Sequence, residues 1–174
     1  MATNSAHLPP QDLEAEKAIL GAVLLDQDSL TSIVQVLRPE HFYRQAHSDI
    51  YAAIFELFEK REPIDLVTLT AQLKSKGLFD KVGGAAYITD LASGVPTVSN
   101  IVHYTKIVKD HYVKRQLISS ATRVTQAAFD ETGDVRKILD DAEQAIFSLS
   151  QQQLKQNFAP VKDTLAESFD RLDD

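Results

Sequence analysis

The five histidines are the residues of this chain best suited to metal binding or proton transfer, but their spacing favours neither role. They are His7, His41, His47, His103 and His111. The zinc-binding pattern His-Glu-x-x-His is absent, and positions 103 and 111 would lie about 80° apart around a helix, a poor arrangement for two ligands of one metal. We therefore expect histidines in solvent or in the core, and no metal site.

Residue types that serve acid–base catalysis or phosphate binding are equally scattered. Glu14 and Glu16 are two residues apart on a predicted helix, so they should point away from each other, and acids in a first turn suit the helix dipole. Gly83-Gly84 lacks the downstream Lys-Ser/Thr of a phosphate-binding loop, and no serine lies in a Gly-x-Ser-x-Gly motif. The sequence predicts no catalytic residue, and an enzyme that uses a histidine and carboxylates is the least favoured of three hypotheses.

A row of basic residues is the remaining candidate for nucleic-acid binding: Lys106, Lys109, Lys114, Arg115 and Arg123. The chain as a whole carries a formal net charge of −7, and acidic residues dominate the segment from 130 to 143. The basic row also lacks the accompanying aromatic residues on which bases stack. We favour a solvated or protein-facing surface over direct contact with DNA.

Composition indicates an ordinary folded protein. The 174 residues are 44% hydrophobic, enough for one sizeable core or a small domain with an appendage. The absence of cysteine excludes disulfides, thiolate zinc sites and cysteine nucleophiles. Residues 1–7 do not resemble a signal peptide, and no apolar run approaches the roughly 20 residues that span a bilayer. We expect a soluble cytoplasmic protein.

The elements that must position these residues are predicted to be helical throughout. Five helices are expected in the first half, over residues 11–25, 30–37, 45–60, 66–76 and 85–91. Asp12 and Asp65 can cap two of them, and Gly77 can end one in the left-handed conformation. Gly21 lies within the first helix, where glycine costs about 1 kcal/mol relative to alanine. We expect it to let another helix pack unusually close.

The second half predicts a long antiparallel helical hairpin. Neither proline nor glycine interrupts residues 100–129, which would span about 45 Å of helix. Gly133 and Asp134 separate this segment from a second amphipathic helix that extends to about residue 152. Because two helices alone offer little core, we expect their apolar stripes to bind other copies of the chain through Ile101, Tyr104, Val108, Val135, Ile138, Leu139, Ala142 and Ile146.

A final amphipathic helix is predicted near the C-terminus, after a polar linker. Its apolar face is formed by Val161, Leu165, Phe169 and Leu172. No earlier segment is obviously built to cover this face, so we expect a fragment that ends just after a helix meant to dock on another domain or subunit. The predicted all-α organisation is a flexible leader (1–10), a small helical bundle (11–98), a helical hairpin (99–152) and a linker with a terminal docking helix (153–174).

Five short motifs follow one another in a specific order and spacing. They are Pro10…Glu14-Ala15-Glu16…Leu20-Gly21-Ala22-Val23-Leu24, Phe42-Tyr43…His47…Ile50-Tyr51…Ala53-Ile54, Pro63-Ile64-Asp65…Thr68-Leu69, Gly83-Gly84…Tyr87-Ile88…Leu91 and Asn100…Tyr104…Ile107-Val108…Arg115-Gln116-Leu117. Together they closely resemble the N-terminal domain of the bacterial replicative DNA helicases of the DnaB family. The resemblance extends from about Leu8 to the end of the chain.

This resemblance implies a noncatalytic assembly domain. In the family, a small helical bundle and a helical hairpin form the N-terminal part of a homohexamer that encircles single-stranded DNA and unwinds the fork with ATP. The N-terminal domains form a collar, often a trimer of dimers, which also carries the docking surface for primase. The terminal residues Val161, Leu165, Phe169 and Leu172 would match the linker helix that packs against a neighbouring motor.

Other expectations follow from the same resemblance. ATP and Mg²⁺ belong to the RecA-like C-terminal motor, so no cofactor is expected in this fragment. A helicase loader is a further implied partner, and single-stranded DNA is expected to contact the whole ring rather than this domain. No membrane is involved. The alternative that we keep is a stand-alone all-helical adaptor, which would bind a partner helix through its terminal stripe.

Overall fold

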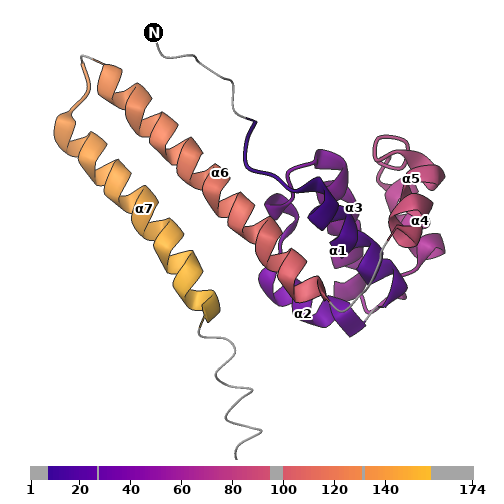
Figure 1. The fold of residues 1–174 in the computed structure, drawn as a ribbon. Helices are drawn as coiled ribbons and strands as arrows, with labels where there is room; N and C mark the ends of the chain where they lie inside the picture. Colours follow the sequence, from indigo (N-terminus) through magenta and orange to yellow (C-terminus); the bar gives the residue numbers. More distant parts are fainter. Residues whose placement is uncertain (1–7, 27, 95–99, 131, 158–174) are drawn as a thin grey trace, which may run out of the picture. The chain divides into compact units, whose positions relative to one another are not determined.

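The computed structural model describes residues 8–26, 28–94, 100–130 and 132–157, and every regular element in these ranges is a helix (Figure 1). The expected all-α fold class is therefore confirmed. The elements are α1 (Leu13–Leu25), α2 (Asp28–Val36), the 3₁₀ turn η1 (Pro39–His41), α3 (Gln45–Glu59), α4 (Leu66–Ser75), α5 (Gly84–Ser93), α6 (Ile101–Phe129) and α7 (Val135–Asn157). Since α7 ends at Asn157, it extends into the segment expected to be a polar linker.

The chain divides into two compact units, residues 1–114 and residues 115–174. This division falls inside α6, whereas the sequence placed the end of the bundle at residue 98. The first half of α6 belongs with α1 to α5 because Ile101 and Val108 are buried in the same core. The second unit contains the end of α6, a short turn and α7, which run antiparallel as a hairpin (Figure 1).

The residues predicted to begin α1 and to begin and end α4 do so in the structure. The Asp12 carboxylate accepts a hydrogen bond from the Ala15 amide at 2.9 Å and begins α1. Asp65 accepts from the amides of Val67 and Thr68 at 2.8 and 2.9 Å and begins α4. Gly77 follows α4 with φ of +65°, the left-handed conformation that glycine adopts without strain.

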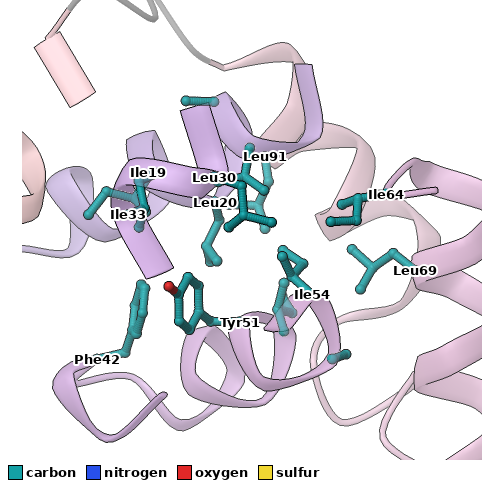
Figure 2. Packing of buried hydrophobic residues seen from close by; sticks show 14 of the residues in the cluster. Ile19, Leu20, Leu30, Ile33, Phe42, Tyr51, Ile54, Ile64, Leu69 and Leu91 are labelled. Atoms are coloured by element: carbon teal, nitrogen blue, oxygen red, sulfur yellow. The ribbon is translucent and has the colours of Figure 1, made fainter. Parts of the chain in front are cut away.

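One continuous core holds the first unit together. Tyr51 and Ile54 of α3 point toward Ile19 and Leu20 of α1, with Leu69 of α4 nearby (Figure 2). These side chains are fully buried, and each contributes about 1.5–3 kcal/mol by leaving water. Helix α1 packs on α2, α3 and α5, and α3 packs on η1 and α4. The bundle thus has its own core, which the second unit does not supply.

Candidate association surface and a buried polar cluster

The apolar stripe of α7 is divided between a half-buried side and an exposed side. Ile138, Ala142 and Leu149 are half-buried, whereas Val135, Leu139 and Ile146 are 58–68% exposed. The latter three residues are spaced four and seven positions apart, so they form one line along the helix. We call this line the α7 seam. It is the exposed remainder of the stripe that the sequence predicted to bind other copies.

The three predicted association residues of α6 lie elsewhere than expected. Ile101 and Val108 are only 7% and 2% exposed and belong to the core of the first unit, and Tyr104 is partly buried against that core. The expectation of an exposed seam on this part of α6 is therefore corrected. The spacing of these residues indicates an apolar face on α6, and the chain's own bundle covers this part of it.

Other exposed apolar residues of the second unit were not among the predicted association residues. They are Leu117, Ile118 and Phe129 of α6 and Phe147 of α7, with exposures from 45% to 82%. Phe129 and Phe147 lie off the main apolar stripes, so a search for helical periodicity passes over them. The sequence indicates exposure of these two phenylalanines only in that each is a large apolar residue on an otherwise polar helix face.

A groove of about 500 Å³ lies between the two legs of the hairpin. From α6 it is lined by Ser120, Arg123, Val124 and Ala127, and from α7 by Ile138, Asp141, Gln144, Ala145 and Ser148. Small side chains are most frequent on the α6 wall, while Arg123 and Asp141 supply opposite charges. Of the half-buried residues of the α7 stripe, Ile138 lines this groove.

Two further predictions concern close helix packing at Gly21 and docking through the C-terminal residues. Gly21 is buried in α1, but the close approach of another helix at this residue stays a prediction. The terminal docking face of Val161, Leu165, Phe169 and Leu172 lies outside the described residues.

A buried polar cluster joins three helices of the first unit. The Glu16 carboxylate accepts from the Tyr43 amide and contacts His47 Nδ1, both at 2.6 Å, and accepts a longer bond of 3.4 Å from the Arg44 amide. On the other side of the ring, His47 Nε2 lies 2.6 Å from the Tyr87 hydroxyl, which also accepts from Arg44 Nη1 at 2.9 Å. Glu16 and His47 are at most 1% exposed. The cluster links α1, the start of α3 and α5.

The local chain conformation places each member of this cluster. Glu16 lies on the inner face of α1, while Glu14, two residues earlier, is exposed and pairs with Lys17 at 2.9 Å, so the two acids point apart as expected. Gly83 precedes α5 with φ of +107°, and a Cβ atom on it would lie 2.7 Å from the Tyr87 Cβ. Position 83 therefore requires glycine, because any side chain there would be strained by the positive φ and would clash with Tyr87 one turn further along the chain.

Both ring nitrogens of His47 have a partner: Nδ1 contacts the Glu16 carboxylate and Nε2 contacts the Tyr87 hydroxyl, whose oxygen also accepts from Arg44 Nη1. Burial raises the pKa of Tyr87 against the opposing charge of Arg44, which keeps the hydroxyl protonated as a donor. A carboxylate, an imidazole and a hydroxyl in series can relay protons in enzymes, but a substrate cannot reach a pair at most 1% exposed. The arrangement fits a structural tie between helices.

Within the described ranges, no group of three or more His, Asp or Glu residues is placed to hold a metal ion. No helix in that part of the chain is both long and apolar enough to cross a bilayer.

Fold and surface together define a class of protein: an all-helical domain with a self-contained bundle and a helical hairpin that exposes apolar side chains. The model of the "DnaB-like helicase N terminal domain" matches residues 8–110. The chain therefore belongs to the DnaB-like helicases and represents their N-terminal, noncatalytic domain; the motor of the family lies in its C-terminal domain. This confirms the resemblance inferred from the motifs.

Similar proteins agree with this assignment. The chain is 40% identical over 166 residues to the replicative DNA helicase DnaC of Bacillus subtilis, and 39% identical over 167 residues to the replicative DNA helicase DnaB of Mycobacterium leprae. These alignments cover 95% of this chain but only 37% and 28% of the two relatives. The chain thus spans about a third of the length of the relatives that it matches, and the stand-alone adaptor is not favoured.

Solved structures show the same fold. The N-terminal domain of DnaB helicase from Mycobacterium tuberculosis matches with a TM-score of 0.77 and 40% identity, covering 80% of this chain and 99% of that one. A DnaB-like replicative helicase, solved in a study of its interactions with primase, matches with a TM-score of 0.65 and 22% identity over 81% of this chain and 31% of that one. At that identity the second match speaks for the fold alone.

Proposed function

We propose that this chain is the oligomerisation and primase-docking collar of a hexameric, ATP-dependent helicase that acts in DNA replication. The observation that carries the proposal is the α7 seam, a line of exposed apolar residues on a domain of this family. The role is geometric, since seams that bury against copies of themselves close a ring and present a platform for other proteins.

The energy of association comes from removing the seam from water. Val135, Leu139 and Ile146 are each more than half exposed, and full burial of such a side chain is favourable by about 1.5–3 kcal/mol. Two copies that pair their seams bury twice this number of side chains. Part of the gain is offset by the loss of translational and side-chain freedom, so association should depend on concentration.

The partners belong to the proposal as well. A DnaB-like replicative helicase of the same fold was solved in a study of its interactions with primase, and we extend that partner to the assembled collar as part of the proposal, because this chain belongs to the same family of helicases. We include a trimer-of-dimers arrangement, a helicase loader, and single-stranded DNA bound by the whole ring. ATP and Mg²⁺ would act in the motor domain. The terminal face from Val161 to Leu172 would dock on a neighbouring motor, and Gly21 would permit close helix packing within each bundle.

Sedimentation equilibrium of the chain from low to high micromolar concentration tests the proposal. We expect the wild type to form dimers or larger species, and the double variant Leu139→Asp/Ile146→Asp to stay monomeric because charges cannot be buried unpaired in the seam. Circular dichroism should show that the double variant remains folded, since the bundle core lies in the other unit.

Val67→Asp is the matched control, because Val67 is 78% exposed on α4 and belongs to the other unit of the chain. It should associate as the wild type does. A wild-type chain that is monomeric at high micromolar concentration would refute the proposed function. The same measurement with the C-terminal domain of primase added should show a heavier complex with the wild type and a weaker one with the double variant.

A further inference from the structure

A groove of about 320 Å³ lies on the first unit, where α1, the end of α5 and the first turns of α6 meet. Its apolar surface comes from all three helices and includes Ala18, Leu91, Tyr104 and Ile107. Leu91 is buried, whereas the other three are half-buried and keep part of their surface open. Sites for small ligands measure roughly 300–1,000 Å³, so this groove has room for one large side chain and not for a whole helix.

Acidic residues surround this apolar surface. Asp12, Glu14 and Asp90 line the groove, and Lys17 is the one cation among the described residues that line it. The Lys17 ammonium donates to Glu14 at 2.9 Å, so its charge is already paired. Asp90 is exposed, and within the described ranges its carboxylate forms no hydrogen bond or ion pair. The groove therefore has an excess of negative charge, and one of its carboxylates is free to bind a cation.

The end of α5 adds to this negative character. The last carbonyl groups of a helix have no partner within the helix, which gives its C-terminal end a partial negative charge. Helix α5 has no basic residue in its last turn to balance that charge. Gly94, which caps α5, is exposed and lines the groove, so no side chain covers this residue's part of the helix end. A cation in the groove would complement both Asp90 and the end of the helix.

We propose that this groove binds an arginine side chain of a partner protein, in a segment with apolar residues beside the arginine. The planar fork of a guanidinium matches the two oxygens of the Asp90 carboxylate. The aliphatic stem of the arginine would lie on the apolar surface, and the Tyr104 ring offers a face on which a guanidinium can stack. The inference does not depend on association through the α7 seam, because the groove lies in the other unit.

A basic protein segment suits this groove better than a nucleic acid or a second copy of the chain does. Nucleic-acid sites need clustered cations, whereas this groove has three acids and a single, paired lysine. The chain itself carries a formal net charge of −7, so an acidic groove on it attracts a basic partner more strongly than another acidic copy.

An amide NMR titration of the full chain with the capped tripeptide acetyl-Leu-Arg-Leu-amide tests this proposal. We expect saturable shifts at the amides of Ala18, Leu91 and Tyr104, which belong to the three helices that line the groove. The same peptide with glutamine in place of arginine should bind these residues about tenfold more weakly, because the charge-assisted hydrogen bonds are lost.

Two variants separate the charge of the groove from its apolar surface. Asp90→Asn should weaken binding of the arginine peptide about tenfold. Ala18→Leu should also weaken it, because the larger side chain fills part of the groove and leaves the charge unchanged. Asp80→Asn is the matched control, since Asp80 is an exposed acid of the same unit that does not line the groove, and it should bind as the wild type does. Circular dichroism should show that all three variants are folded.

Three results would overturn the proposal. The first is equal affinity of the wild type and Asp90→Asn for the arginine peptide, or equal affinity of the wild type for the two peptides. The second is a single-stranded oligodeoxynucleotide that shifts the same amides at concentrations at which the peptide does not, because that result would assign the groove to a nucleic acid. The third is weaker self-association of Asp90→Asn in sedimentation equilibrium without peptide, which would assign the groove to a second copy.

Discussion

At the scale of single residues, Glu16 shows how one buried carboxylate can tie helices together. It accepts from the Tyr43 amide just before α3 and from His47 within α3, while its own backbone belongs to α1. The His47 ring extends the connection to Tyr87 of α5. A carboxyl group that is 1% exposed is tolerated because its oxygens are hydrogen-bonded.

Glu16→Ala should therefore destabilise the bundle strongly. The substitution leaves the Tyr43 and Arg44 amides and His47 Nδ1 without their acceptor, and we expect the free energy of unfolding to fall by about 2–4 kcal/mol. Urea denaturation at pH 7 measures the change.

The neighbouring Glu14→Ala variant is the control, because Glu14 is exposed and makes only a surface ion pair with Lys17. It should change the free energy of unfolding by less than about 0.5 kcal/mol. Equal effects of the two variants would contradict the structural role of Glu16.

At the level of a helix, contacts between chain neighbours can fix where the element begins and ends. Helix α4 is the clearest case, with Asp65 accepting from two amides at its start and Thr68 accepting from the Asp65 amide in return. Gly77 completes the other end. These contacts involve neighbours in the chain, so they do not depend on how the helix packs.

The Asp65 cap should make α4 sensitive to acid. The hydrogen bond from the Thr68 amide is the main cause that holds the pKa of Asp65 below its ordinary value of 3.8. Because the folded state has the lower pKa, the contribution of Asp65 to stability is present above pH 3.8 and is lost as the pH falls through the folded-state value.

Asp65→Asn keeps a good capping residue but cannot titrate. The urea midpoint of the wild type should therefore decline more steeply than that of the variant between pH 5 and pH 3. Parallel curves for the two proteins over this range would contradict the prediction.

At the scale of the whole molecule, α6 belongs to two units and packs differently in each of them. Its first half completes the core of the bundle, and its second half pairs with α7. A bundle that ended at residue 98 would lose Ile101 and Val108 from that core. The unit that can fold by itself should therefore include α6 as far as Lys114.

Truncation tests this boundary. A chain of residues 1–114 should unfold cooperatively in urea and remain monomeric, because it has the core and lacks the α7 seam. A chain of residues 1–98 should be markedly less stable, since removal of a single large aliphatic side chain from a core costs about 2–5 kcal/mol.

Ile101→Ala in the full chain provides a second measurement, with the exposed Val102→Ala on the same helix as its control. The first variant should lose stability by about 2–5 kcal/mol and the second by less than about 0.5 kcal/mol. Equal stability of the two truncated chains would place the boundary at residue 98 after all.

The helical fold class, the caps at Asp12 and Asp65, the left-handed Gly77 and the family could all be predicted from the order of the residues. These features depend on neighbouring residues or on ordered motifs, which are present in the chain before it folds. Periodicity also revealed that α6 and α7 each have an apolar face.

What covers each apolar face became known from the folded chain and could not be predicted from its sequence. Ile101 and Val108 turned out to be core residues, while Val135, Leu139 and Ile146 stayed exposed, although all five share the same helical spacing. The Glu16–His47–Tyr87 cluster was likewise invisible, because its members are 31 and 40 residues apart in the chain. Burial and long-range hydrogen bonds depend on which segments meet in space, and helical periodicity carries no information about the partner.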